Sequence, residues 1–251
     1  MTLLAVERIK LVSTRSPWWC AGIALLITLG FTALFVANSD DLAVTVGSTQ
    51  FAFNLGMIII MVMAALAITT EYRFSTIKTT FQAAPNRTAV LAAKAAVVAL
   101  AAGVVGEITA FATYGLARLM KPAADLGLDN PAEWRQVAGI GLIYFFAAIL
   151  ALGVGILVRQ SAAAISILLV YTLLVENLIV LIPTVGEQIQ KWMPFTAANH
   201  FATAGIPAPV EGQGPPLLDL PYGPWGGLAY FAAISVAILV AGIVVTNRRD
   251  A

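Results

Sequence analysis

Residues 137–158 read VAGIGLIYFFAAILALGVGILV and contain no charged side chain. A helix needs roughly 20 apolar residues to cross a bilayer, because each residue adds only about 1.5 Å toward about 30 Å of hydrocarbon. This stretch is long enough to do so. The short link 159–162 joins it to a second apolar stretch, 163–182, so the two are expected to form a tight helical hairpin.

Outward from this hairpin, four further stretches have the same apolar character. The six predicted spans are 18–37, 51–69, 89–116, 137–158, 163–182 and 228–246. Of the 251 residues, 60% are hydrophobic and 11% are charged, whereas a soluble domain carries about 25% charged residues. The sequence therefore predicts an all-α membrane protein with six transmembrane helices in a single domain, 1–251.

The Lys and Arg residues indicate how the spans are oriented, because cytoplasmic loops are rich in them. With the N-terminus in the cytoplasm, ten of the fourteen lie on the cytoplasmic side. The four on the outer side are Arg118, Lys121, Arg135 and Lys191. We therefore predict a multi-pass protein of the plasma (inner) membrane with both termini cytoplasmic.

The segment before the first span, 1–17, has the pattern of a short interfacial helix. Ala5, Ile9 and Val12 share one helical face, and charged residues lie opposite. Tryptophans favour the headgroup level of a bilayer. An ordinary basic membrane flank is the alternative. The residues expected to hold the helix at the interface are Glu7, Lys10, Arg15, Trp18 and Trp19.

The cytoplasmic loop 71–88 contains a second amphipathic pattern. Phe74, Ile77 and Phe81 recur at i, i+3 and i+7, and Pro85 with Asn86 ends the pattern. A helix of this kind can lie on the membrane or dock into a groove of a partner protein. A plain solvated connector is the alternative.

The outer stretch 183–227 is rich in proline. Its first part, 185–204, is apolar enough to form short extracellular helices that dip into the outer leaflet. Its second part is rich in Gly and Pro, and is expected to form an irregular cap before the last span.

Several kinds of chemistry lack their signatures in this sequence. The chain has no G-x-x-x-x-G-K-[ST] phosphate loop, no H-E-x-x-H, no G-x-S-x-G elbow, one histidine and one cysteine. We therefore expect no catalytic residue, no metal site and no cofactor in the chain itself. The net charge of +1 gives no reason to expect nucleic acid as a partner.

Two acidic residues lie inside predicted spans. Glu107 is in the third span, and Glu176, followed by Asn177, is in the fifth. A charge at the bilayer centre costs about 2.5–3.5 kcal/mol, so such groups face protein or water. These residues either line a translocation pathway or clamp neighbouring helices, and both interpretations fit the sequence.

Two motifs carry a resemblance to a known family. The first, 7–19, is similar to E-x-x-K-L-x-S-x-R-S-x-W-W. The second, 71–94, is similar to E-Y-R-x-x-T-I-x-x-T-x-x-x-x-P-x-R-x-x-x-x-x-x-K, and 193–195 is a weaker echo in the outer stretch. With these motifs and its six predicted spans, the chain resembles the ABC-2 type permeases of type V exporter architecture, most closely the small actinobacterial ones.

The resemblance implies the membrane subunit of an ATP-binding-cassette exporter, which moves an amphipathic small molecule, lipid or peptide outward by alternating access. The partners would be two copies of a separate ABC ATPase, which hold ATP and Mg, a second permease, identical or paralogous, and membrane lipids. Segment 1–17 would be the interfacial connecting helix, and 71–88 would contain the coupling helix that docks on the ATPase. The ATPase-coupling residues would be Glu71, Arg73, Phe74, Ile77, Lys78 and Phe81.

Two other functions fit the residues. A proton-coupled secondary transporter would use Glu107 and Glu176 as proton carriers. A non-transporting scaffold or sensor subunit would assemble stably with an enzyme. Transport that survives ATP depletion would identify the first, and assembly without flux would identify the second.

Overall fold

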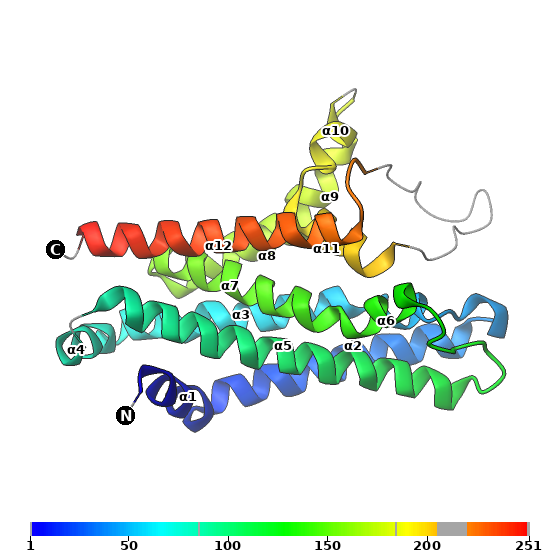
Figure 1. The fold of residues 1–251 in the computed structure, drawn as a ribbon, viewed down its shortest axis with the longest axis horizontal. Helices are drawn as coiled ribbons and strands as arrows, with labels where there is room; N and C mark the ends of the chain where they lie inside the picture. Colours follow the sequence, from blue (N-terminus) through cyan, green and yellow to red (C-terminus); the bar gives the residue numbers. More distant parts are fainter. Residues whose placement is uncertain (1, 85, 184, 205–219, 250–251) are drawn as a thin grey trace.

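The computed structural model describes residues 2–84, 86–183, 185–204 and 220–249. Within these residues the regular structure is helical, with no strand. Six helical segments in the described part are long and apolar enough to cross a membrane, and they pack into one bundle (Figure 1). The all-α architecture with six spans is therefore confirmed.

The helices follow one another along the chain in a simple order. They are α1 (Leu3–Ser13), α2 (Arg15–Asn38), η1 (Asp41–Ala43), η2 (Gly47–Gln50), α3 (Phe53–Arg73), α4 (Thr76–Ala83), α5 (Arg87–Met120), α6 (Pro131–Ala138), α7 (Ile140–Val158), α8 (Ser161–Val170), η3 (Tyr171–Val175), α9 (Glu176–Leu178), η4 (Ile179–Leu181), α10 (Gly186–Gln190), α11 (Pro194–Thr203) and α12 (Pro224–Arg249).

Helix α7 lies at the centre of the bundle, packed against α3, α5 and α12. In the most apolar 18-residue stretch of α7, 72% of the residues are buried. The corresponding share is 22% in each of the spans at 15–38, 161–181 and 224–248. A helix that is apolar on all sides belongs inside a protein, whereas the outer three spans present apolar faces to lipid or to a partner. The decisive apolar stretch of the sequence is thus the core element of the fold.

Glycines allow the neighbours of α7 to approach it closely. A Cβ atom on Gly106 of α5 would lie 2.8 Å from Cγ of Tyr144, and one on Gly153 would lie 2.8 Å from the backbone nitrogen of Leu239 in α12. Small residues at such crossings let helix backbones pack tightly in membranes, where burial from water supplies no driving force.

Two predicted spans differ from the structure in detail. The fourth begins at Ile140, because 131–138 form the separate helix α6, which is not among the predicted elements. Asn130 caps α6, and Glu133 completes a capping box. The fifth span is helical from Ser161 to Leu181 but contains a π-helical segment, η3, so it is not one regular α-helix.

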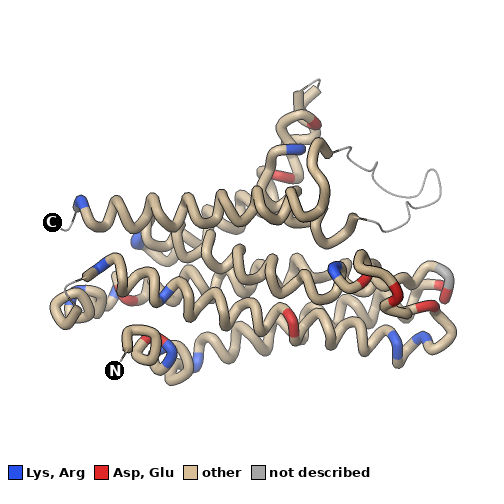
Figure 2. The backbone as a smooth tube through the Cα atoms, in the orientation of Figure 1, with Lys and Arg blue, Asp and Glu red and all other residues tan. Residues whose placement is uncertain are grey.

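Charged residues gather at the two ends of the bundle (Figure 2). The N-terminus, α4 and the C-terminal end of α12 lie at one end, and α6 and α11 lie toward the other (Figure 1). At the first end, Asn247 donates a 2.9 Å hydrogen bond to Thr88, which joins α12 to the start of α5. The predicted short helices of the outer stretch correspond to α10 and α11, and the predicted irregular cap falls largely at 205–219, outside the described residues.

Candidate functional site

The corner between α1 and α2 is fixed by local hydrogen bonds. Thr2 caps α1, because its hydroxyl accepts a hydrogen bond from the backbone N–H of Ala5. Thr14 has an extended backbone and ends α1, and α2 begins at the next residue. The indole N–H of Trp18 donates a 3.0 Å hydrogen bond to the carbonyl of Val12, which closes the corner.

The corner between α3 and α4 is a tight turn. Ser75 adopts a left-handed conformation with φ of 58°, which costs energy for any residue that has a side chain. The turn directs Ile77 into the core, where it is only 4% exposed. Phe81, one helical turn further along, is half-buried beneath the guanidinium of Arg87, 5.6 Å from its ring centre.

Charged groups from α1, α3 and α5, together with a hydroxyl of α4, meet beside these two corners. The Lys94 ammonium donates hydrogen bonds to Glu7 and, at 2.9 Å, to Glu71. The Lys10 ammonium donates to the same two carboxylates, at 2.8 Å to Glu7 and 3.4 Å to Glu71, and at 3.3 Å to the hydroxyl of Thr80. We call these five residues the charge cluster.

The charge cluster is electrically balanced and largely buried. Its two lysines match its two glutamates, and Glu7 and Lys94 are each 4% exposed. Burial alone would lower the pKa of Lys10, but the hydrogen bond to Glu7 and the charge of Glu71 outweigh it and raise that pKa. Removing one partner of such a pair leaves an unpaired buried charge, at a cost of about 3–5 kcal/mol.

The charge cluster can transmit force between elements that lie far apart in the sequence. It joins α1 through Glu7 and Lys10, α3 through Glu71, α4 through Thr80 and α5 through Lys94. Because Ile77 also anchors α4 in the core, a push on α4 would displace the ends of α3 and α5, two of the long spans.

Sequence reasoning missed this convergence. All five cluster residues occur in the two motifs quoted above, but Lys94 and Thr80 are not among the predicted site residues. The pairing of Glu7 with Lys94 bridges 87 positions, and spacing along the chain carries no information about contacts of that range. The only available signal was the presence of opposite charges at fixed motif positions near span ends.

The structure revises the predicted docking face of α4. The prediction that Ile77 contributes to an external face is wrong, because Ile77 is buried within the chain. Phe81 and Glu71 also turn inward, Phe81 against the core and Glu71 into the charge cluster. Phe74 is 67% exposed, and the side chains around it at the corner, Arg73, Ser75, Thr76 and Lys78, are exposed as well.

The other predicted interfacial residues divide into two sets. Glu7 and Lys10 belong to the charge cluster. Arg15, Trp18 and Trp19 are exposed at the start of α2, and the two indoles are 64% and 70% exposed. This exposure is what side chains at a headgroup layer would show.

The two acids inside spans have different surroundings. Glu176 is 5% exposed and caps α11, because its carboxylate accepts hydrogen bonds from the backbone N–H groups of Phe195 (3.0 Å) and Thr196 (2.9 Å). Glu107 packs against Gly141 of α7 and has no hydrogen-bond partner among the described residues. No hydrogen bond or ion pair joins the two acids in the described part of the chain.

Asn177 serves its own helix. Its side-chain amide donates to the carbonyls of Thr172 (3.2 Å) and Leu173 (3.1 Å), both within the π-helical segment η3. An amide in this position satisfies backbone carbonyls that an irregular membrane helix leaves without regular partners. The clamp interpretation of Glu176 and Asn177 therefore fits their contacts better than the pathway interpretation.

A family model described as ABC-2 family transporter protein matches residues 3–175, more than half of the chain. The chain belongs to this family. No curated protein matches it. The matched region includes the whole charge cluster and ends one residue before Glu176, so α10, α11 and α12 lie beyond it.

Membership of the ABC-2 family establishes the general role. The chain is a multi-pass membrane protein and a permease subunit, a membrane transport component that works with an ABC ATPase. For an ABC-2 permease, the cluster that ties a short helix to two spans at one end of the bundle is the candidate functional site.

Proposed function

We propose that the protein is the membrane subunit of an ABC exporter, and that α4 couples it to a separate ATPase. The transporter would contain two ATPase subunits, which hold ATP and Mg, and two permeases, identical or paralogous. It would move an amphipathic small molecule, lipid or peptide outward by alternating access. The chain itself would bind no nucleotide.

The observation that carries this proposal is the attachment of α4 to the spans. Its inner side is fixed by Ile77 and by the hydrogen bond between Lys10 and Thr80, whereas Phe74 at the corner before it is 67% exposed. The Arg73 guanidinium lies 5.5 Å from the Phe74 ring centre. An exposed aromatic ring flanked by cations suits a partner groove that is apolar at its centre and acidic at its rim.

The proposed orientation places the charge cluster in the cytoplasm. The corner residue Arg159 donates to Thr246 at 3.4 Å, so the link between α7 and α8 meets the end of α12 there. The segments that carry ten of the fourteen Lys and Arg residues thus belong to one end of the bundle, as the positive-inside rule expects of a cytoplasmic face. Both termini would lie on that side of the plasma (inner) membrane.

The proposed mechanism needs only different contacts with two states of the ATPase. Closure of the ATPase pair on ATP would displace α4, and the charge cluster would pass that displacement to α1, α3 and α5. The spans at 15–38 and 161–181 are only 22% buried, so they can move against a second permease without disrupting the core around α7.

The test is to purify the tagged full-length chain from its native membranes and to identify co-purifying ABC ATPases. Phe74→Asp should reduce the recovered ATPase roughly tenfold, because burying a carboxylate in an apolar groove costs more than 1.4 kcal/mol. The matched control is Leu119→Asp, since Leu119 is 81% exposed at the far end of α5. That control should retain the ATPase.

Two results would contradict the proposal. One is the absence of any ABC ATPase in material that still transports. The other is equal recovery of ATPase with Phe74→Asp and with Leu119→Asp, which would remove α4 and its corner from the docking interface. Transport that collapses with the proton gradient rather than with ATP would favour a secondary transporter. Against that alternative, both oxygens of Glu176 accept hydrogen bonds from α11.

A further inference from the structure

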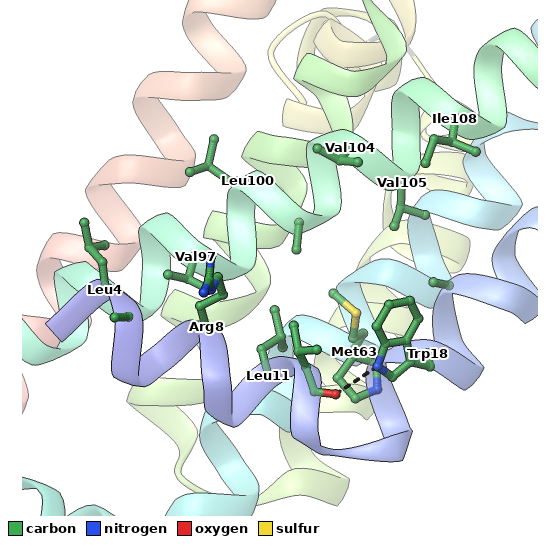
Figure 3. A pocket seen from close by; sticks show the side chains of 15 residues that line it. Leu4, Arg8, Leu11, Trp18, Met63, Val97, Leu100, Val104, Val105 and Ile108 are labelled. Carbon is green, nitrogen blue, oxygen red and sulfur yellow. Dashed lines mark hydrogen bonds between the residues drawn. The ribbon is translucent and has the colours of Figure 1, made fainter. Parts of the chain in front are cut away.

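An apolar groove of about 680 Å³ runs between α1, α2 and α5 (Figure 3). Met63 of α3 reaches its floor, and Trp18 of α2 lies at its edge. Among the described residues that line it, Arg8 is the one charged side chain. We call this feature the α1–α5 groove.

Arg8 has no counter-ion among the described residues. It lies among apolar α1 residues that line the groove, between Leu4 and Leu11, and it points toward Val97 of α5 (Figure 3). No ion pair or hydrogen bond links its guanidinium to a described residue. Its neighbour Glu7 is unavailable, because both of its carboxylate oxygens accept hydrogen bonds from lysines in the charge cluster.

The groove has the length of one bilayer leaflet. From Val97 to Ile108 it follows α5 for about 17 Å, since a helix rises about 1.5 Å per residue. Half of a hydrocarbon core of about 30 Å is about 15 Å. Trp18, whose indole N–H is bonded to Val12, lines the same groove and marks the headgroup level at which such rings collect.

The open side of the groove is apolar. Leu100, Val104 and Ile108 of α5 are 61%, 59% and 55% exposed, in a segment that belongs to a membrane span. The surrounding solvent is therefore acyl chain rather than water. A cation at headgroup level above a leaflet-long apolar channel is complementary to an amphiphile with a negative head and one aligned tail.

We propose that the α1–α5 groove binds one phospholipid with an anionic headgroup. Its phosphate pairs with the Arg8 guanidinium, and one acyl chain lies along Leu100, Val104 and Ile108. The site goes beyond the proposed exporter function and does not depend on it. Because Glu7 and Lys10 fix α1 to α3, α4 and α5 through the charge cluster, the lipid braces the same helix that the cluster holds.

The test uses the full-length chain in phosphatidylcholine nanodiscs that contain a few per cent of phosphatidylglycerol with a photoreactive tail. After illumination, mass spectrometry maps the labelled peptides. Label should concentrate on α1 and on 97–108. Arg8→Gln should reduce the labelling roughly tenfold, because losing a charge-assisted hydrogen bond weakens lipid affinity by about that factor. Arg8→Lys should keep most of the labelling. Val104→Trp, which fills the groove, should also reduce the label.

The matched controls change similar residues outside the groove. Arg15→Gln removes an exposed cation of α2, and Leu26→Trp enlarges a 70% exposed side chain of α2 that does not line the groove. Both should label like the unchanged chain. The Arg8 substitutions alter an exposed side chain, so the test remains valid if Val104→Trp fails to fold.

Three outcomes would overturn the proposal. Equal labelling by a photoreactive phosphatidylcholine, whose choline balances the charge of its phosphate, would remove the preference for an anionic headgroup. Labelling that Arg8→Gln leaves unchanged would remove the phosphate contact. Efficient disulfide cross-linking between two copies of a Val104→Cys chain would show that a second permease, and not a lipid, covers the groove.

Discussion

The two ends of the bundle use their polar residues in different ways. At the end that contains α1 and α4, largely buried ion pairs connect different helices through residues that are 23 to 87 positions apart. At the end that contains α6 and α11, polar side chains complete helix termini. The amide of Asn130 caps α6, Glu176 caps the start of α11, and Arg135 donates to the carbonyl of Ala204 at its end.

This difference indicates what each end can do. Hydrogen bonds at helix termini satisfy backbone groups that water can also satisfy, so the elements that they join can separate at a moderate cost. Buried ion pairs between elements fail if those elements separate, because each charge would then be desolvated without a partner. The end with α4 is therefore built to move as one body, as force transmission requires. At the other end, α9 and α6 are joined to α11 by hydrogen bonds at helix termini, which cost less to break than buried ion pairs.

Lys94→Gln should have the largest effect on stability. It leaves Glu7 without its most buried partner and leaves Glu71 with Lys10 alone, at a cost of about 3–5 kcal/mol. For a chain of this size that is a decrease of about 10 °C in melting temperature. Thermal unfolding of the purified chain in detergent measures it.

The double variant Glu7→Gln with Lys94→Gln sharpens the same comparison. Removing both charges eliminates the unpaired carboxylate, so the double variant should be more stable than the sum of the two single losses predicts. Additive losses would show that the two side chains do not interact, and the one-body description of this end would fail.

Glu176→Ala tests the opposite end. The loss of an acceptor for two backbone N–H groups should cost about 1–3 kcal/mol, and hydrogen exchange should increase at the start of α11 rather than across the bundle. Asn177→Ala is the matched control, since Asn177 is exposed and bonds only to its own helix. If Glu176→Gln abolished transport without changing exchange in α11, the pathway interpretation would return.

Ser75→Gly should have a smaller effect in the stabilising direction. Glycine adopts a φ of 58° without the clash that a side chain brings, which is worth about 1 kcal/mol or less after its entropy in the unfolded chain is counted. Ser75→Val should destabilise by about 1–3 kcal/mol. Gln82→Val, at an exposed helical position of α4, should change little. Equal melting temperatures for Ser75→Gly and Ser75→Val would exclude strain at this corner.

The sequence predicts the spans well because their signal is local. Twenty consecutive apolar residues define a membrane helix without reference to the rest of the chain, and each of the six predicted stretches overlaps a candidate span. The face of α4 was predicted wrongly for a reason that the structure makes clear. Helix α3 continues to Arg73 and α4 starts at Thr76, so Phe74 does not share a helix with Ile77, and the i, i+3 spacing has no meaning across the Ser75 turn.

The site required information that no local pattern contains. The charges of Glu7 and Lys94 were visible, but their pairing depends on α1 packing against α5. The role of Glu176 likewise depends on a helix 19 positions further on. From the sequence, an acid within a span has the same appearance whether it lines a pathway or caps a neighbour.

The smallest predicted effect is a difference in pH response between the two ends. Burial lowers the pKa of His200 in α11, with the charge of Arg135 acting in the same direction and a hydrogen bond with the Tyr222 backbone opposing both. The unfolded chain therefore takes up this proton first, and the stability that His200 contributes is lost as pH falls below about 6.5. The pKa of Lys10 is raised by folding, so its contribution to stability is retained at every pH below about 10.5.

Acidification from pH 7 to 5.5 should thus weaken the α11 end and leave the contribution of Lys10 intact. Because His200 is only half-buried, the decrease in melting temperature should be below about 2 °C. His200→Phe keeps a ring against Tyr222, whose centre lies 5.9 Å away, and should remove this decrease. Lys10→Gln should lower stability equally at both pH values. The same acid response in the chain with His200→Phe would assign the titration to another group, and the two ends would then not differ in this respect.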